Sequence, residues 1–307
     1  MGARFLVVCL NPTLQNTYII DSLRAGQVNR VIDHRLDASG KGVNVTRVLT
    51  QLGEDAVHLT QGGGRHLELF RTLCEADRVA LEVVEGDVEI RHCHTLLGQA
   101  DRTMTEIVEP GQVVPDGMET KLINTYRTLL GDAHTVVITG SKAPGFTDTL
   151  YPAMVGEARR AGVRTILDIR GDELVAALLE RPTLVKINLS EFSQTFRGVE
   201  MPEETAMADV PAELLRLITT VSCESGAEMV VSNGRRPLLY ADGNTLETVE
   251  PRRVEPVNAI GSGDALTAGI AAGLYRGTSL PEAIELGLDC AAKNLARLKP
   301  GSIGDER

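Results

Sequence analysis

The sequence predicts an α/β protein with a mostly parallel central sheet and helices on both of its faces. The first observation behind this prediction is that short β-branched runs alternate along the chain with segments of helical periodicity. The second is the composition, since 307 residues with 43% apolar and 24% charged side chains allow a large core without disulfide or metal support. Right-handed crossovers would place the carboxyl ends of the strands, and the loops after them, along one edge of the sheet.

The individual elements are predicted from periodicity and from turn residues. The apolar run 5–10 is a buried strand that ends at Asn11-Pro12, and the helix 43–52 has its apolar residues at helical spacing. The glycines at 62–64 form a turn between a strand and the next helix. The further predicted strands are 56–60, 135–139, 163–168, 184–188 and 229–232, and the further predicted helices are 67–74, 122–130, 150–161, 172–180, 212–225, 263–274 and 281–298.

Two extended segments interrupt the alternation of strands and helices. They cover about 13–36 and 88–108, and a polar turn at 98–102 predicts a hairpin in the second segment. We interpret the two segments as a small β lid over one end of the main sheet. No repeat, low-complexity tract or flexible linker divides the chain, so we expect residues 1–307 to form a single domain that carries this lid.

Charge and cysteine content argue against several classes of protein. The 31 basic and 42 acidic residues give a net charge of −11, and aromatic residues are only 3%, which disfavours broad binding to nucleic acid or to anionic membranes. The five cysteines are widely separated and form no CxxC pair, so we expect reduced thiols in a cytoplasmic protein. The most apolar late stretch, 265–274, is too short to cross a bilayer.

The strongest functional signal is the segment 258–266, NAIGSGDAL, where a glycine turn enters an apolar helix. Gly261, Ser262 and Gly263 would present backbone N–H groups at the positive end of the helix dipole, which suits an anion. Asp264 lies beside this anion site, so the pair suits phosphoryl transfer to a hydroxyl whose proton the carboxylate accepts. The helix N-terminus should keep Asp264 ionised and a weak base. The structural alternative is that Asp264 only caps the helix.

Three weaker motifs agree with this chemistry. In segment 39–44, SGKGVN, two glycines flank Lys41 at the entrance of a helix, which suits either a clamp for an anionic substrate or a turn with a solvated lysine. Segment 188–191, NLSE, follows a buried strand and either holds Mg²⁺ through water or caps a helix. Segment 232–234, SNG, is a candidate phosphate turn. The P-loop, the HExxH motif and the EF-hand loop are absent from the sequence.

Taken together and in this order, these segments resemble the PfkB branch of the ribokinase-like carbohydrate kinases over nearly the whole chain. Asn11-Pro12 is similar to the NP opening of the subgroup that contains 1-phosphofructokinase, tagatose-6-phosphate kinase and the minor 6-phosphofructokinase. Segment 39–47 resembles its GGKGxNxAR motif. The other similar segments are Arg91, 105–111 for TExxxPG, 140–145 for GSLPPG, 184–191 for VKPNxxE and 261–264 for GAGD.

The resemblance implies a kinase that uses ATP and Mg²⁺ to phosphorylate a ketohexose phosphate to a bisphosphate. Asp264 would be the base, and Gly261, Ser262 and Gly263 would form the anion hole. The residues implied for the sugar phosphate are Gln15, Gly40, Lys41, Asn44, Arg91, Ser141 and Lys142. Those implied for the nucleotide are Lys186, Asn188, Ser232, Gly234 and Asn294, with Glu191 and Asn188 organising Mg²⁺ partly through water. The lid would close over the sugar and pair two subunits into a homodimer.

Several positions depart from the pattern of the family. Gln15 stands where an aspartate usually binds sugar hydroxyls, and Thr95 stands where the fructose-1-phosphate enzymes have a lysine. Ser39 replaces a glycine, the pair 142–143 replaces the Leu-Pro of GSLPPG, and Ala259 replaces a threonine. These changes concern the sugar more than the chemistry. We hypothesise that Lys142 supplies the phosphate-binding charge that is lost at Thr95.

Other functions stay open at the level of the sequence. The nearest alternative keeps the chemistry but phosphorylates an unphosphorylated sugar or a nucleoside, although Lys41 and Arg91 favour a phosphorylated acceptor. A non-catalytic sugar-phosphate-binding regulator is suggested by Gln15 and Thr95, but such a binder would be free to lose Asp264. A nicotinamide-dependent oxidoreductase would need an early GxGxxG motif, which the sequence lacks.

Overall fold

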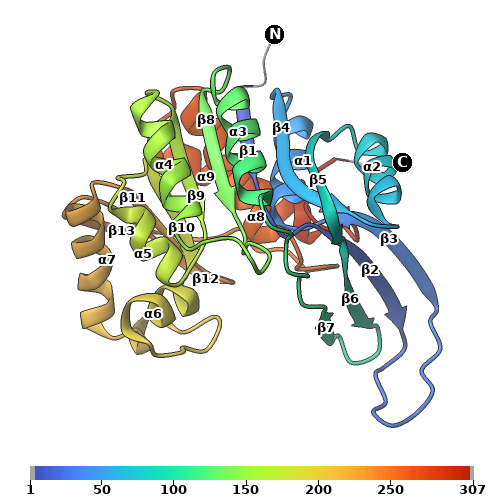
Figure 1. Ribbon diagram of the computed structural model, residues 1–307. Coiled ribbons are helices and arrows are strands. Elements are labelled where there is room, and N and C mark those ends of the chain that lie inside the picture. The colour runs from blue at the N-terminus through green and yellow to red at the C-terminus, as the bar shows by residue number, and fades with distance from the viewer. Residues whose placement is uncertain (1–3, 305–307) are drawn as a thin grey trace.

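The computed structural model describes residues 4–304 and arranges them around two sheets (Figure 1). The large sheet has the strand order β13-β12-β11-β10-β9-β8-β1-β4-β5, and the small sheet has the order β3-β2-β6-β7. The strands of the large sheet are β1 (Phe5–Val8), β4 (Ala56–Gly63), β5 (Ala80–Glu89), β8 (Thr135–Thr139), β9 (Arg164–Asp168), β10 (Leu184–Asn188), β11 (Glu228–Asn233), β12 (Arg236–Asp242) and β13 (Thr245–Val249).

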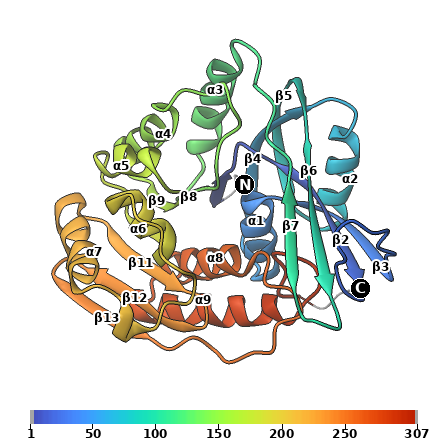
Figure 2. The same ribbon diagram turned by 90° about the horizontal axis from the view of Figure 1, so that it is seen from below.

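Helices cover both faces of the large sheet, as the sequence predicts (Figures 1 and 2). Leu6 and Val8 point to the face packed by α3 (Met118–Leu130), α4 (Leu150–Arg160), α5 (Asp172–Leu178), α6 (Leu189–Arg197) and α7 (Ala212–Ser225). Phe5 and Val7 point to the face packed by α1 (Lys41–Gln51), α8 (Ser262–Tyr275) and α9 (Leu280–Leu295). None of the helices in residues 4–304 combines the length and the apolar character that a bilayer crossing requires.

The parallel part of the large sheet brings the carboxyl ends of its strands to one edge. β1 pairs in parallel with both β4 and β8, and β8, β9, β10 and β11 continue the parallel series. Thr139 is in register with Asp168, and Asn188 with Ser232, so polar side chains end neighbouring strands. Ligands of open α/β sheets bind outside such an edge, and the site described below lies there.

The small sheet is formed by β2 (Thr13–Ile20), β3 (Asp33–Ser39), β6 (Arg91–Gly98) and β7 (Met104–Val108). The predicted hairpin is confirmed, because β6 and β7 pair antiparallel across the turn at 99–103. The base of the small sheet packs against α2 (Leu67–Ala76), where Leu14 and Ala38 join Phe70 in a buried cluster. Most of the small sheet extends away from the large one, as a lid would (Figures 1 and 2).

Three strands and one α-helix were not predicted from the sequence. The strand β5 has an irregular polar pattern, β12 and β13 add an antiparallel hairpin at the other edge, and α6 begins directly after β10. The predicted turn at 62–64 is wrong for its first two glycines, which lie inside β4. A Cβ on Gly63 would lie 1.8 Å from the carbonyl oxygen of Gly86, so close approach of β5 requires this glycine. The last helix ends at Leu295, three residues before the predicted end.

His58 is a buried histidine beneath α1. Its side chain is 1% exposed, Nδ1–H donates to the carbonyl of Val7 (3.2 Å), and Nε2 has no hydrogen-bond partner within residues 4–304. A Cβ on Gly42 would lie 2.3 Å from Cε1 of His58, so the first turn of α1 can lie this close only with glycine at that position. Burial lowers the pKa of His58 from 6.5 to about 4, because the imidazolium would lose its hydration.

We expect His58 to make the fold sensitive to acid. The unfolded chain binds a proton at His58 near pH 6.5 and the folded chain only near pH 4, so its contribution is intact above pH 6.5 and is lost as the pH falls toward 4. Between pH 8 and pH 5 the loss should be about 2 kcal/mol. Urea unfolding across this pH range should show that the free energy of unfolding depends less steeply on pH in His58→Gln than in the parent protein. The exposed His134 gives the control His134→Gln, which should keep the parent slope; an unchanged slope in His58→Gln would contradict the assignment.

Candidate active site

Asp264 is a buried carboxylate in the first turn of α8. Gly261 is the N-cap with φ of 81°, and Asp264 is the third residue of the helix, 6% exposed. Its Oδ2 accepts a hydrogen bond of 2.8 Å from Nδ2 of Asn44 in α1, and within residues 4–304 no side chain caps this helix. The interpretation of Asp264 as a plain helix cap is therefore wrong, since its carboxylate is turned toward another helix.

The glycine turn before Asp264 is held by close packing. A Cβ on Gly261 would lie 2.3 Å from the backbone N of Gly301, and a Cβ on Gly301 would lie 2.3 Å from Cβ of Asn44. A Cβ on Gly263 would lie 2.9 Å from Nζ of Lys186. The glycines thus let the segment 300–302 and a lysine approach the turn, a reason for glycine that is independent of any ligand.

Two of the three amides expected to form an anion hole are available. The Ser262 N–H donates to the carbonyl of Ala259 at 3.3 Å, which closes the turn. The N–H groups of Gly261 and Gly263 have no acceptor among the residues that the structure describes. The residues of the turn are half-buried, so the turn is not sealed inside the protein, and free amides at a helix N-terminus are the groups that bind anions.

Asp168, the last residue of β9, forms ion pairs with two lysines beside this turn. Its carboxylate is 1% exposed; Nζ of Lys41 lies 3.0 Å from Oδ1, and Nζ of Lys186 lies 3.4 Å from Oδ2. The hydroxyl of Thr267 in α8 also donates to Oδ2 at 3.2 Å. Sequence reasoning missed Asp168 as a site residue, although an acidic residue at the carboxyl end of a buried parallel strand was an available signal.

The charges of this cluster shift the protonation of its members. Burial raises the pKa of Asp168, but Lys186 and Lys41 outweigh burial and hold it well below its usual range. Burial also raises the pKa of Asp264; Lys41 opposes this effect and the negative charge of Asp168 adds to it, so the net pKa is raised. The raised pKa is opposite in direction to the sequence-based expectation that Asp264 is kept ionised and a weak base, because burial and Asp168 outweigh the lowering by Lys41, Asn44 and Lys186. A raised pKa makes Asp264 a stronger base.

The residues predicted for the sugar phosphate lie around the N-terminus of α1 and the adjoining strands. Gly40 caps α1 with φ of 96°, and the side chain of Lys41 is 37% exposed. Arg91 begins β6; its Nη1 donates to the carbonyl of Glu109 (2.8 Å), while its buried Nε has no partner among the described residues. Ser141 follows β8, is exposed, and accepts a hydrogen bond of 3.3 Å from Asn11.

The two departures from the family pattern in the lid are partners of one another. Nε2 of Gln15 in β2 donates to the hydroxyl of Thr95 in β6 at 2.8 Å, and both residues are buried. A neutral pair therefore occupies the two positions where the family pattern has an aspartate and a lysine. The loss of one charge is matched by the loss of the other, so neither leaves an unpaired ion.

Lys142 does not carry a free charge. Its side chain is 7% exposed and forms ion pairs with Glu173 and with Asp148, whose carboxylate lies 3.1 Å away. Two carboxylates more than neutralise the ammonium group. The hypothesis that Lys142 replaces the phosphate-binding charge lost at Thr95 thus lacks structural support.

The residues predicted for the nucleotide and Mg²⁺ lie at the ends of β10 and β11. Asn188 and Glu191 form a capping box at the start of α6, with Asn188 Oδ1 accepting from the N–H of Glu191 at 2.7 Å. The capping interpretation is thus confirmed; it uses the single side-chain oxygen of Asn188 but only one of the two carboxylate oxygens of Glu191. The other Glu191 oxygen, Oε1, lies 3.5 Å from Arg170, a cation that the sequence analysis did not select. Ser232 is half-buried next to Asn188.

Gly234 and Asn294 differ in their access to a ligand. Gly234 is exposed, in a turn with φ of 57°. Asn294 in α9 is fully buried: its Nδ2 donates to the carbonyl of Ile260 (2.9 Å) and its Oδ1 accepts from the N–H of Ser302 (3.1 Å). The prediction of Asn294 as a nucleotide ligand is therefore not supported, because this side chain ties the glycine turn to the segment 300–302.

A parallel sheet with this strand order, a small second sheet and a glycine turn beside a buried carboxylate define a carbohydrate kinase with the ribokinase-like fold. Residues 5–305 match the family described as pfkB family carbohydrate kinase, and the chain belongs to this family. The resemblance that the sequence motifs suggested is thereby confirmed.

Solved structures of similar fold cover nearly the whole chain. Phosphofructokinase-2 from Escherichia coli in complex with fructose-6-phosphate has a TM-score of 0.85 and 24% identity, covering 97% of this chain and 96% of that one. A possible 1-phosphofructokinase from Thermotoga maritima has a TM-score of 0.84 and 23% identity, covering 96% and 92%. Arabidopsis thaliana ribokinase complexed with ribose and ATP has a TM-score of 0.75 and 17% identity, covering 98% and 95%.

The packing of the glycine turn predicts a stability difference between two glycine substitutions. Gly261 and Gly277 have nearly the same φ, 81° and 80°, but a Cβ on Gly277 would meet no atom within 4 Å. Gly277→Ala should lower the free energy of unfolding by about 1–2 kcal/mol, which is the strain of placing a residue with a Cβ in the left-handed conformation. Gly261→Ala should cost clearly more, because its Cβ would collide with Gly301. Chemical unfolding of both variants measures the difference, and equal losses would disprove the tight contact between the turn and the segment 300–302.

Proposed function

We propose that this protein transfers the γ-phosphoryl group of ATP to a hydroxyl of a sugar phosphate, giving a ketohexose bisphosphate, with Asp264 as the base. The observation that carries the proposal is the buried Asp264 carboxylate next to a glycine turn in which two amides have no acceptor among the described residues. A base and an anion site in contact are what phosphoryl transfer to an alcohol requires.

The division of labour in the site follows from the positions of the charges. The amides of Gly261 and Gly263 would stabilise the transferring oxygens, and Lys186 would add positive charge from beneath the turn, where its Nζ lies against Gly263. Lys41, on the side of α1, would face the acceptor. Asp168 holds both ammonium groups, so their positions are set before substrate binds.

The donor set at the ends of β10 and β11 suits Mg²⁺. Glu191 and Asn188 supply a carboxylate and an amide oxygen, the hard ligands that this ion prefers, and Oε1 of Glu191 is free of the capping box. When bound, Mg²⁺ would neutralise phosphate charge in the nucleotide. Ser232 and Gly234 at the end of β11 would lie along the same phosphates, and Arg170 beside Glu191 adds a further cation.

A phosphorylated acceptor is favoured by the cations on the sugar side. Gly40, Lys41 and Arg91 lie at or near the N-terminus of α1 and the start of β6, and Ser141 lies on the loop after β8. The E. coli enzyme of similar fold was solved in complex with fructose-6-phosphate, and the Thermotoga protein is described as a possible 1-phosphofructokinase, which makes ketohexose phosphates the first compounds to test. Fructose 1-phosphate, fructose 6-phosphate and tagatose 6-phosphate are the proposed substrates.

The small sheet is proposed to serve as the lid of a single kinase domain. It extends beyond the carboxyl edge of the large sheet, where it would cover the sugar and exclude water during transfer (Figure 1). Pairing of two lids would give a homodimer. The widely spaced free cysteines agree with a reducing cytoplasm as the place of action.

A kinase for an unphosphorylated sugar or nucleoside is the second candidate function. It is favoured by the neutral pair of Gln15 and Thr95, and by the ion pairs of Lys142 with two carboxylates, because both features leave less positive charge for a phosphate group. A coupled assay of ADP release decides between the candidates when run with the three ketohexose phosphates and with free sugars and nucleosides. Each substrate is measured with Mg²⁺ and with EDTA, which should abolish turnover. Tight binding of a sugar phosphate without ADP release would instead indicate a regulator.

Asp264→Asn should lower kcat by orders of magnitude with little effect on the KM for the sugar. The amide keeps the size of the side chain but cannot accept the hydroxyl proton in the transition state. Steady-state kinetics with the best acceptor of the screen measure the effect. Asp289→Asn is a matched control, because Asp289 lies in α9 and pairs on the surface with Arg252. A kcat within a few-fold of the parent value would rule out Asp264 as the base.

A further inference from the structure

We propose that Asn44 is a positioning residue that holds one oxygen of the catalytic carboxylate Asp264, and that the buried Arg47 fixes the orientation of the Asn44 amide. The inference rests on the proposed role of Asp264. It assigns Asn44 a task different from the sugar contact expected from its motif, and it gives a function to an arginine that the proposed mechanism does not use.

The Asn44 amide has only one orientation that satisfies its neighbours. Its Oδ1 accepts from Nη1 of Arg47 (3.2 Å) and from the hydroxyl of Ser39 (3.3 Å), and its Nδ2 donates to Oδ2 of Asp264 (2.8 Å). A guanidinium group can only donate, so the side of the amide that faces Arg47 must be the oxygen. The N–H side is then directed at the carboxylate, and a reversed amide would place two acceptors against each other.

Arg47 is itself immobilised. Its side chain is 1% exposed, and its donors reach the carbonyls of Pro300 (2.8 Å) and Ala38 (2.6 Å) and the carboxylate of Asp77 (2.9 Å). These partners belong to the segment after α9, to β3 of the small sheet and to the residue that ends α2. Three separate parts of the chain, together with α1 itself, therefore fix the guanidinium that orients Asn44.

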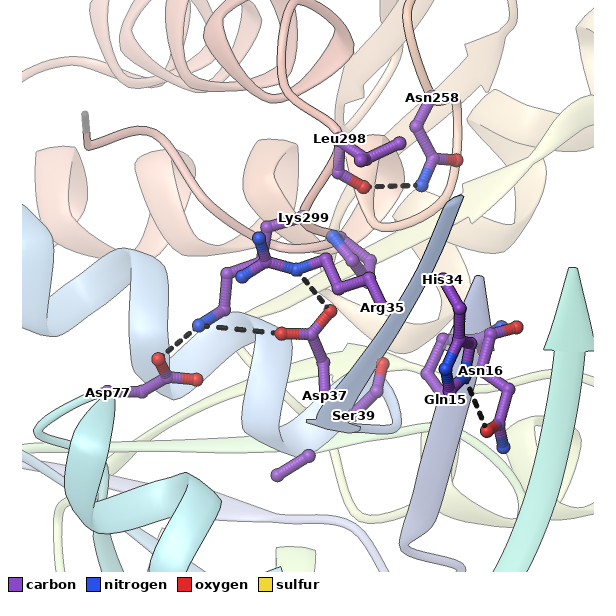
Figure 3. A network of polar contacts seen from close by, with 12 residues as sticks. Gln15, Asn16, His34, Arg35, Asp37, Ser39, Asp77, Asn258, Leu298 and Lys299 are labelled. Atoms are coloured by element: carbon purple, nitrogen blue, oxygen red, sulfur yellow. Dashed lines mark hydrogen bonds and ion pairs between the residues drawn. The ribbon is translucent and has the colours of Figure 1, made fainter. Parts of the chain in front are cut away.

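The anchor of Arg47 continues into the base of the lid. Figure 3 shows Lys299 between Asp77 and Asp37, and Asp37 on β3 accepts a hydrogen bond from Arg35. Asp77 thus holds both Arg47 and Lys299. The position of Asn44 depends on a polar network that connects the catalytic helix pair to the small sheet.

The contact determines which oxygen of Asp264 acts as the base. Oδ2 accepts from Asn44, whereas Oδ1 has no hydrogen-bond partner among the described residues, so we assign Oδ1 as the oxygen that accepts the hydroxyl proton. As the sugar oxygen forms its bond to the γ-phosphorus, the bond from that phosphorus to the bridging oxygen of ADP breaks, and the hydroxyl proton passes to Oδ1. ADP leaves with the electron pair of the broken bond. A hydrogen bond to the ionised carboxylate also opposes the rise in the pKa of Asp264 caused by burial.

The test is the variant Asn44→Ala, measured by steady-state kinetics and by the pH dependence of kcat. The kcat for the best acceptor should fall about tenfold or more, while the KM for the sugar should stay within about twofold, because only the geometry of the base is lost. The acid limb of the kcat–pH profile should move to higher pH, since the ionised Asp264 loses a donor. The other charged groups near Asp264, namely Lys41 in α1, Asp168 at the end of β9 and Lys186 in β10, are unchanged by the substitution.

Two further variants separate positioning from general damage to α1. Thr46→Ala removes a buried hydroxyl from the same helix, whose one bond within the described part of the chain is to the carbonyl of Gly42 (2.7 Å), so it should lower stability without moving the acid limb. Arg47→Lys should shift the acid limb in the same direction as Asn44→Ala, with a smaller loss of kcat. Where this variant fails to fold, Ser39→Ala is used instead, which removes one of the two donors to Oδ1 of Asn44. It should give a small shift of the acid limb in the same direction.

A failure of the positioning role of Asn44 can be distinguished from a failure of the proposed kinase function. A higher sugar KM in Asn44→Ala, with kcat and the acid limb unchanged, would overturn the positioning role and make Asn44 a sugar ligand. If the parent protein phosphorylates no acceptor, the proposed function fails, yet the contact can still be measured. Carboxyl ¹³C NMR titration, with Asp264→Asn for assignment, should then show a higher pKa of Asp264 in Asn44→Ala than in the parent protein. An equal pKa would overturn the inference.

Discussion

The carboxylate of Asp168, buried between two ammonium groups, is the interaction on which the site depends. It joins Lys41 at the start of α1 to Lys186 in β10, and Thr267 in α8 completes its hydrogen bonds. A charge so far from water is tolerated only with well-placed partners, and removing one of them would leave the others uncompensated. The same ion cluster therefore fixes three elements of the fold and concentrates positive charge beside the glycine turn.

The main sheet could be predicted because its signal is local. Buried parallel strands appear as short apolar runs, and the helices between them show their apolar faces at regular spacing. The strand β5 and the hairpin of β12 and β13 lie at the edges of the sheet, where exposed positions dilute this pattern. The sequence predicts a turn at Gly63, but glycine is required there by the close approach of Gly86 on the neighbouring strand. A local sequence pattern contains no information about that contact.

The site was predictable as motifs but not as pairs. The turn before Asp264 and the entrance of α1 are continuous in sequence, so their chemistry could be proposed from adjacent residues. The contact of Asn44 with Asp264 joins positions 220 residues apart, and that of Gln15 with Thr95 joins positions 80 apart. Lys142 illustrates the converse error: a basic residue in a motif suggested a free charge, whereas the fold supplies it with two carboxylates.

The segment 300–302 has a consequence for the order in which the enzyme acquires activity. Pro300 accepts from Arg47, Gly301 fits between Asn44 and Gly261, and Ser302 donates to Asn294, so these three residues hold the glycine turn in place. During synthesis the ribosome adds them after every other part of the site. The nascent kinase can build its sheet early, but the glycine turn reaches its final packing only after the segment 300–302 has been made and has docked.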